Sequence, residues 1–159
     1  MIFEEVMLEL ESYGSDSIKA IFKKHGAKEP LFGVKVEDMK KILKKTKKNH
    51  ALSLKLFQSN NADAMYLAGL MADETKISKE DLQDWVKRAY YSALSEFAVP
   101  WVASETAFGF ELGKEWITSE QENIASAPPL GSLPLAFSHG PSGPCCSAIG
   151  AIHWDDATP

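Results

Sequence analysis

Apolar residues recur every three or four positions through most of the chain, which is the period of an amphipathic helix. The first stripe consists of Phe3, Val6, Met7, Leu10 and Tyr13. Comparable stripes predict further helices within residues 18–22, 36–46, 52–57, 65–71, 82–90 and 111–117. β-branched residues are sparse and never alternate with polar residues over a useful length, so we expect no strand.

Turn and capping residues separate these stripes into short helices. Gly14 is placed to end the first helix, and residues 27–34 (AKEPLFGV) contain a proline and a glycine that mark a connector. Asn61 can cap the helix that follows it, and Ser78 with Asp81 resembles a capping box. The pattern predicts an all-α protein in which antiparallel helix pairs, joined by short turns, form a bundle or a helical solenoid.

The chain changes character after Ala127. Residues 128–159 hold six of the eight prolines and both cysteines but no lysine or arginine, and they show no helical or strand period. Proline at this density is incompatible with a continuous helix. We therefore divide the chain into an α-helical domain, residues 1–127, and an irregular tail, residues 128–159. The tail is either a natural Pro/Gly-rich segment or the product of a reading-frame change, and the sequence of the coding DNA distinguishes the two.

Size and composition limit the class of protein. A chain of 159 residues that is 45% hydrophobic can form one domain with a substantial core. No apolar run approaches the roughly 20 residues of a membrane-spanning helix, and the acidic N-terminus is unlike a signal peptide. Cys145 and Cys146 are adjacent and the four histidines are scattered, so we expect no disulfide framework, no metal and no cofactor. We expect a soluble, cytoplasmic protein that does not bind membranes.

The distribution of charge narrows the class of partner. The formal net charge is −5, yet twelve lysines and only three acidic residues lie between Lys19 and Lys55. The helix predicted to start near residue 36 has lysines on both sides of its apolar stripe: Lys40, Lys44 and Lys47 on one flank, and Lys41, Lys45 and Lys48 on the other. A lysine run is most often a solvated helix face, but a single-sign strip on an acidic protein is typical of phosphate binding. We expect these six lysines and Lys35 to contact the backbone of a nucleic acid.

Candidate catalytic groups are few. The sequence contains no phosphate-binding glycine motif and no serine or cysteine nucleophile with a recognisable histidine partner. Residues 90–105 (YYSALSEFAVPWVASE) bring four aromatic residues together with Glu96 and Glu105 around Pro100. A carboxylate beside aromatic faces can position water or stabilise a developing cation on a bound nucleoside. Aromatic residues at helical spacing are, however, more often part of the core.

Several segments resemble one known family. LFGVKVEDMKKILKKTKK is similar to the second helix pair of the DNA alkylation repair (AlkD-like) family, in which an aromatic-Gly-Ile/Val turn leads into a basic helix. ADAMYLAGLMAD, YYSALSEFAVP and EWITSEQENIASA match that family in the same order, so the resemblance covers residues 31–127. It implies a solenoid of HEAT-like repeats whose concave basic surface holds duplex DNA. Active members of the family are glycosylases that release N3- and N7-alkylated purines.

The resemblance also implies roles for single residues. The family's catalytic carboxylate lies four positions before the proline of an apolar-Pro segment, which assigns that role to Glu96. A second register assigns it to Glu105 instead, four residues after Trp101. We expect Tyr91 and Trp101 to supply the aromatic walls of the cleft, whereas Ser92 stands where a DNA-facing tryptophan is implied.

These departures from the family pattern bear on activity. Glutamate in place of aspartate moves the carboxylate by one methylene, and a misplacement of about 1 Å can lower a rate about a hundredfold. The resemblance also implies a DNA-contacting arginine near Ser126, where there is none. We therefore expect a protein that binds duplex DNA and whose alkylpurine glycosylase activity is weak or lost. The alternatives are a non-catalytic scaffold that binds a protein partner and an RNA-binding member. A helical array that stops at Ala127 also leaves an apolar end through which the chain can self-associate.

Overall fold

The computed structural model describes residues 1–127, which form helices and no strand. In chain order the elements are α1 (Phe3–Ser12), α2 (Asp16–Lys24), α3 (Val36–Thr46), α4 (His50–Gln58), α5 (Ala62–Met71), α6 (Lys79–Arg88), the π-helix η1 (Ala93–Ala98), α7 (Val99–Ser104), α8 (Gly109–Ile117) and α9 (Glu122–Ala125). Each predicted helical stripe lies on one of these helices, except that Tyr13 and Tyr90 lie just beyond the ends of α1 and α6. The predicted irregular tail, residues 128–159, lies outside the described residues.

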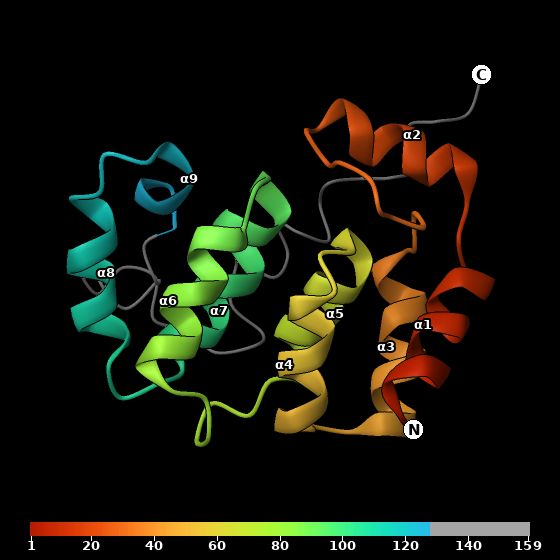
Figure 1. Ribbon diagram of the computed structural model, residues 1–159, viewed down its shortest axis with the longest axis horizontal. Helices are drawn as coiled ribbons and strands as arrows, with labels where there is room; N and C mark the ends of the chain where they lie inside the picture. The colour runs from red at the N-terminus through yellow and green to blue at the C-terminus, as the bar shows by residue number, and fades with distance from the viewer. Residues whose placement is uncertain (128–159) are drawn as a thin grey trace.

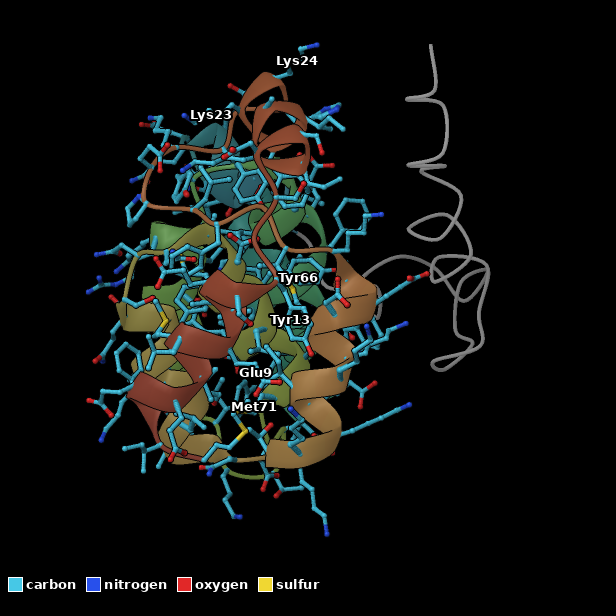
Figure 2. The ribbon with its side chains drawn as sticks, turned by 90° about the vertical axis from the view of Figure 1, so that its right-hand side faces the viewer. Glu9, Tyr13, Lys23, Lys24, Tyr66 and Met71 are labelled. Carbon is cyan, nitrogen blue, oxygen red and sulfur yellow. The ribbon has the colours of Figure 1, made fainter. Side chains whose placement is uncertain are left out.

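The helices stack as successive pairs along one direction (Figure 1). α4 packs against α5, α6 against α7, and α8 against α9. α5 lies between α3 on one side and η1 with α7 on the other, so these elements form a continuous row. α1 packs against α3, α4 and α5, and α2 lies across one end of α1 and α3 (Figures 1 and 2). This is the predicted helical solenoid.

A stacked aromatic pair joins two consecutive repeats. The ring of Phe57 in α4 lies parallel to that of Trp85 in α6, with centroids 4.2 Å apart and planes 2° from parallel. Phe57 is 0% exposed and Trp85 is 2% exposed. Removing a buried aromatic side chain of this size typically costs about 3–5 kcal/mol. The pair therefore contributes strongly to the fixed spacing between the α4–α5 and α6–α7 repeats.

Side-chain caps begin α5 and α6, as predicted. Asn61 accepts hydrogen bonds from the backbone N–H groups of Asp63 and Ala64 at 3.1 and 3.2 Å. Ser78 and Asp81 form a complete capping box, in which each side chain accepts a hydrogen bond of 3.0 Å from the other residue's backbone N–H. Caps of this kind contribute about 1 kcal/mol each.

The interruption predicted at Pro100 takes the form of a π-helical turn. Pro100 lies in the first turn of α7, directly after η1. A proline lacks a backbone N–H, and in an α-helix its ring would clash with the carbonyl four residues earlier, which here belongs to Glu96. The wider turn of a π-helix accommodates that carbonyl. The chain can therefore continue as a helix, and Glu96 lies inside the widened segment.

Candidate nucleic-acid interface

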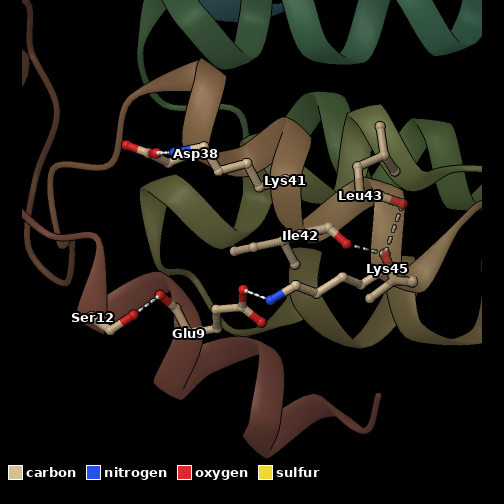
Figure 3. A network of polar contacts seen from close by, with 8 residues as sticks. Glu9, Ser12, Asp38, Lys41, Ile42, Leu43 and Lys45 are labelled. Carbon is tan, nitrogen blue, oxygen red and sulfur yellow. Dashed lines mark hydrogen bonds and ion pairs between the residues drawn. The ribbon is translucent and has the colours of Figure 1, made fainter.

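The two lysine flanks of α3 differ in their surroundings, although all of these lysines are exposed. Each lysine of one flank forms an ion pair: Lys41 with Asp38 at 2.6 Å, Lys45 with Glu9 at 2.5 Å, and Lys48 with Glu74. Figure 3 shows the first two of these pairs beside α1. The flank of Lys40, Lys44 and Lys47 forms no ion pair with any described residue.

The partners of the paired flank come from three places: Asp38 lies in α3 itself, Glu9 in α1, and Glu74 after α5. α1 contacts α3 on the side of Lys41 and Lys45, so the carboxylate of Glu9 meets the ammonium of Lys45. The ammonium of Lys41 also lies 5.4 Å from the centre of the Tyr13 ring. Hydrogen bonds to Asp38 and Glu9 raise the pKa values of Lys41 and Lys45, respectively. Sequence reasoning treated the two flanks alike because Glu9 and Glu74 lie outside the lysine-rich segment.

Lys35 belongs with the unpaired flank. It is the exposed N-cap residue of α3, and it forms no ion pair within residues 1–127. We call Lys35, Lys40, Lys44 and Lys47 together the free lysine row. An unpaired surface lysine can bind an anionic partner directly, because no ion pair with a carboxylate of the protein has to break first.

The lysines of α2 are mostly neutralised. Glu29, in the connector, lies 3.1 Å from the ammonium of Lys19 and 2.7 Å from that of Lys23. Hydrogen bonds from Lys23 and Lys19 lower the pKa of Glu29 from 4.5 to about 2. Figure 2 shows Lys23 and Lys24 at the outer end of α2. Lys24 forms no ion pair with another described residue, so it keeps its charge unpaired at this end of α2.

A cavity of about 110 Å³ lies beside the free lysine row. Its walls come from α2 and the residue after it, the connector, α3, α5, and η1 with the two residues before it. The lining is mainly apolar and aromatic, and it includes Phe22, Val36, Met39, Tyr66, Tyr91 and Phe97. Sequence reasoning did not select Phe22 or Tyr66. Phe22 belongs to a helical apolar stripe, in which nothing separates a cavity wall from the core, and Tyr66 lies beside the stripe of its helix.

Asp63 anchors the wall of this cavity. The residue is 1% exposed, and its carboxylate accepts hydrogen bonds from the backbone N–H groups of Phe32 at 2.6 Å, Gly33 at 3.0 Å and Val34 at 2.9 Å. Burial raises the pKa of Asp63, and the three N–H donors oppose that rise. Sequence reasoning missed this role. The available signal was an acid two residues after the Asn61 cap, within an otherwise apolar helix.

Tyr91 and Trp101, the two predicted aromatic walls, lie in different surroundings. Tyr91 lines the cavity and is 9% exposed, and burial raises the pKa of its phenol. Trp101, ten residues later and in α7, is not part of the cavity wall. Its indole N–H donates a hydrogen bond of 3.3 Å to the carboxylate of Glu105. Tyr91 therefore lines this cavity and Trp101 does not, and the roles of both as aromatic walls for DNA stay a prediction.

The two candidate carboxylates also differ. Glu96 is exposed in η1, between the cavity-lining residues Ala93 and Phe97, and forms no hydrogen bond or ion pair with another described residue. Glu105, at the end of α7, is exposed and accepts the hydrogen bond from Trp101. Of these two carboxylates, Glu96 is the one carried by an element that contributes to the cavity.

Metal sites and membrane spans are both absent from residues 1–127. No cluster of three or more His, Cys, Asp or Glu side chains that could hold a metal ion occurs there. Within the same residues, no helix is both long enough and apolar enough to cross a membrane.

Known proteins resemble this chain in sequence. An uncharacterized protein of Listeria innocua and another of Listeria monocytogenes are each 32% identical to this chain over 126 residues. The alignments cover 76% of this chain but 56% of each Listeria protein, so the chain spans little more than half the length of these relatives.

A solved structure shares the fold. It is described as "a new family of proteins related to the HEAT-like repeat DNA glycosylases with affinity for branched DNA structures". It is 40% identical to this chain, with a TM-score of 0.77, and the match covers 80% of this chain and 55% of the neighbour. The predicted HEAT-like repeat fold is thereby confirmed. Residues 6–123 also match the family described as DNA alkylation repair enzyme, and so this chain belongs to the DNA alkylation repair enzyme family.

Proposed function

We propose that this chain binds DNA through the free lysine row. The observation that carries the proposal is the asymmetry of α3, whose one flank is neutralised by Glu9, Asp38 and Glu74 while the other stays unpaired. Lys40, Lys44 and Lys47 follow one another at intervals of four and three residues, so they project from the same side of the helix. Three unpaired ammonium groups on one side of α3, with Lys35 at the start of the helix, can neutralise phosphates.

The family and the solved neighbour support DNA as the polyanion. The neighbour is described as having affinity for branched DNA structures. We therefore include a junction as well as a duplex among the DNAs to be tested. Lysines on phosphates give affinity with little sequence selectivity, so structure rather than sequence is expected to distinguish the substrates.

The test compares two triple variants of the full chain by fluorescence anisotropy. Lys40→Gln/Lys44→Gln/Lys47→Gln removes the free flank, and Lys41→Gln/Lys45→Gln/Lys48→Gln removes the paired flank. Both change the net charge by the same amount, so the long-range field is matched. DNA affinity is measured on a duplex and on a three-way junction at salt concentrations from about 50 to 200 mM.

We expect the first variant to lower the slope of log affinity against log salt by about 2.7, or about 0.9 for each phosphate that is no longer neutralised. The second variant should change the slope by much less, because Lys41, Lys45 and Lys48 already have carboxylate partners. Equal reductions of the slope in both variants would argue against the free lysine row. If the chain captures a protein partner and does not retard DNA in a gel, a scaffold function is favoured instead.

For catalysis, we propose Glu96 rather than Glu105 as the acidic group. Glu96 is exposed, lies on η1 beside the cavity and has no partner among the described residues, whereas Glu105 is engaged by Trp101. If the chain releases alkylated purines from methylated duplex DNA, Glu96→Gln should abolish release and leave DNA affinity nearly unchanged. Glu105→Gln is the matched control and should retain activity. The opposite result assigns the role to Glu105.

A further inference from the structure

A second group of lysines lies apart from the free lysine row, on α2 and at the start of the connector. We infer that this group contacts one arm of a branched DNA while the free lysine row contacts another. The two-arm arrangement rests on the proposed DNA binding and deepens it, because it assigns the class of DNA and a second contact surface.

The second group keeps a positive charge of its own. We call its members the α2 cluster: Lys19, Lys23, Lys24 and Lys28. Residues 19–29 contain these four lysines and a single acid, Glu29, so the segment has a formal net charge of +3. Glu29 pairs with both Lys19 and Lys23, so one carboxylate faces two ammonium groups. Lys24 and Lys28 are exposed and form no ion pair with any described residue, so both are available to phosphates.

Backbone hydrogen bonds fix the direction of α2 relative to α3. The backbone N–H of Ser15, the N-cap of α2, donates to the carbonyls of Phe32 and Gly33, both at 3.1 Å. These two residues lie shortly before α3, so the two helices begin at the same corner. From there α2 runs across the end of α3, and Lys23 and Lys24 lie at its outer end (Figures 1 and 2). The two basic surfaces therefore leave this corner in different directions.

The outer end of the α2 cluster is also held in place. Gly26 turns the chain after α2 with a φ of +93°, and Ala27 is 5% exposed. The carbonyl of Lys28 accepts a hydrogen bond of 3.1 Å from the phenol of Tyr90, which follows α6. This bond ties the turn to the row of helices. A bound DNA therefore meets the α2 cluster and the free lysine row at a set angle.

This angle favours a branched DNA over a straight one. α2 has 9 residues and α3 has 11, so each helix spans only about 14–17 Å. That length is about half of one helical turn of duplex DNA, which rises roughly 34 Å. A duplex on both surfaces would have to change direction within this distance, although duplex DNA is stiff over roughly 150 base pairs. The arms of a three-way junction already diverge at the branch point, so they can lie on both surfaces without this deformation.

The test compares two double variants of the full chain by fluorescence anisotropy, on a duplex and on a three-way junction. Lys24→Gln/Lys28→Gln removes the unpaired charges of the α2 cluster. Lys55→Gln/Lys87→Gln is the matched control, because both residues are exposed on other helices, α4 and α6, and have no ion-pair partner within residues 1–127. Both variants change the net charge by the same amount, and circular dichroism confirms that they fold.

We expect Lys24→Gln/Lys28→Gln to lower the slope of log affinity against log salt by about 1.8 for the junction, or about 0.9 for each phosphate. The duplex slope should stay at the wild-type value, and the control should change neither slope. A second readout is photo-crosslinking of the junction by a chain with p-benzoylphenylalanine in place of both Lys28 and Lys44. Its two crosslinks should map to different arms of one junction, and two crosslinks on the same arm would contradict the arrangement.

The outcomes separate the two-arm arrangement from the proposed DNA binding. If Lys24→Gln/Lys28→Gln lowers the duplex slope as much as the junction slope, the α2 cluster belongs to a single duplex surface and the arrangement is wrong. If it changes neither slope while loss of the free flank of α3 lowers both, the free lysine row binds DNA and the α2 cluster does not. If no DNA is bound at low salt, both proposals fail together.

Discussion

The carboxylate of Asp63 accepts a hydrogen bond of 3.0 Å from the backbone N–H of Gly33, thirty residues earlier in the chain. Phe32 and Val34 donate to the same carboxylate, so the first turn of α5 holds the connector that leads into α3. The connector places Lys35 at the start of the free lysine row and Val34 in the cavity wall. Asp63 therefore positions the proposed interface without belonging to the lysine row.

Replacing Asp63 by Asn is expected to destabilise the chain by about 2–4 kcal/mol. An amide has one oxygen and two N–H donors, so at least one backbone N–H of Phe32, Gly33 and Val34 loses its acceptor and faces a donor instead. Urea unfolding at neutral pH, followed by circular dichroism, measures the change. Asp38→Asn is the control, since its pair with Lys41 is exposed and worth less than about 1 kcal/mol. Equal effects of the two substitutions would contradict the anchoring role.

Gly33 is required for a second reason, which is the close approach of α2. Its φ is +77°, and a Cβ there would lie 2.5 Å from the backbone N of Lys19 and 2.6 Å from the backbone O of Ser15. We expect Gly33→Ala to cost about 3 kcal/mol or more, as the sum of backbone strain and displacement of α2.

Gly26→Ala is the matched control for this prediction. Gly26 has a φ of +93°, but a Cβ there would find its nearest heavy atom 3.9 Å away, on Tyr91. This substitution carries the backbone strain without the collision and should cost about 1 kcal/mol. A difference between the two unfolding free energies measures the packing of the connector on α2, and no difference would contradict it.

The helical architecture could be predicted from the sequence because it depends on local signals. The period of apolar residues, the cap at Asn61 and the box of Ser78 with Asp81 lie within a few residues of the helices they define. The π-helical turn was visible only as Pro100, since a proline shows that the helix must change but not how.

The candidate site was less accessible to sequence reasoning because it depends on contacts between distant segments. Glu9 neutralises Lys45 from a helix that precedes it by more than thirty residues, and Asp63 reaches back to Gly33 over a similar span. A helical wheel of α3 shows two equivalent lysine flanks. The carboxylates of Glu9 and Glu74, both distant in sequence, and of Asp38 in α3 neutralise one flank and leave the other as the candidate interface.

The ion pairs of Glu29 predict a local pH dependence. The pKa of Glu29 is lowered from 4.5 to about 2 by Lys23 and Lys19. A depressed carboxyl pKa means that the stabilisation is present above pH 4.5 and is lost as the pH falls from 4.5 toward 2. The carboxyl carbon of Glu29 should therefore titrate near 2 by NMR, and Lys23→Met should move its midpoint upward. A midpoint near the ordinary value in the unmodified chain would contradict the pair.

Lys47 offers a way to separate binding from folding, because it combines an unpaired charge with backbone strain. It ends α3 with φ 58° and ψ −168°, a region that is costly for any residue but glycine. Lys47→Gly should raise the free energy of unfolding by about 1 kcal/mol while lowering the salt slope of DNA binding by about 0.9. Urea unfolding and anisotropy titrations measure the two effects on the same preparation. A weaker binder that is also more stable cannot owe its reduced affinity to unfolding, so this pair of changes ties Lys47 to a phosphate. If Lys47→Gly leaves the slope of log DNA affinity against log salt unchanged, Lys47 does not contact a phosphate. The proposed interface then consists of Lys35, Lys40 and Lys44.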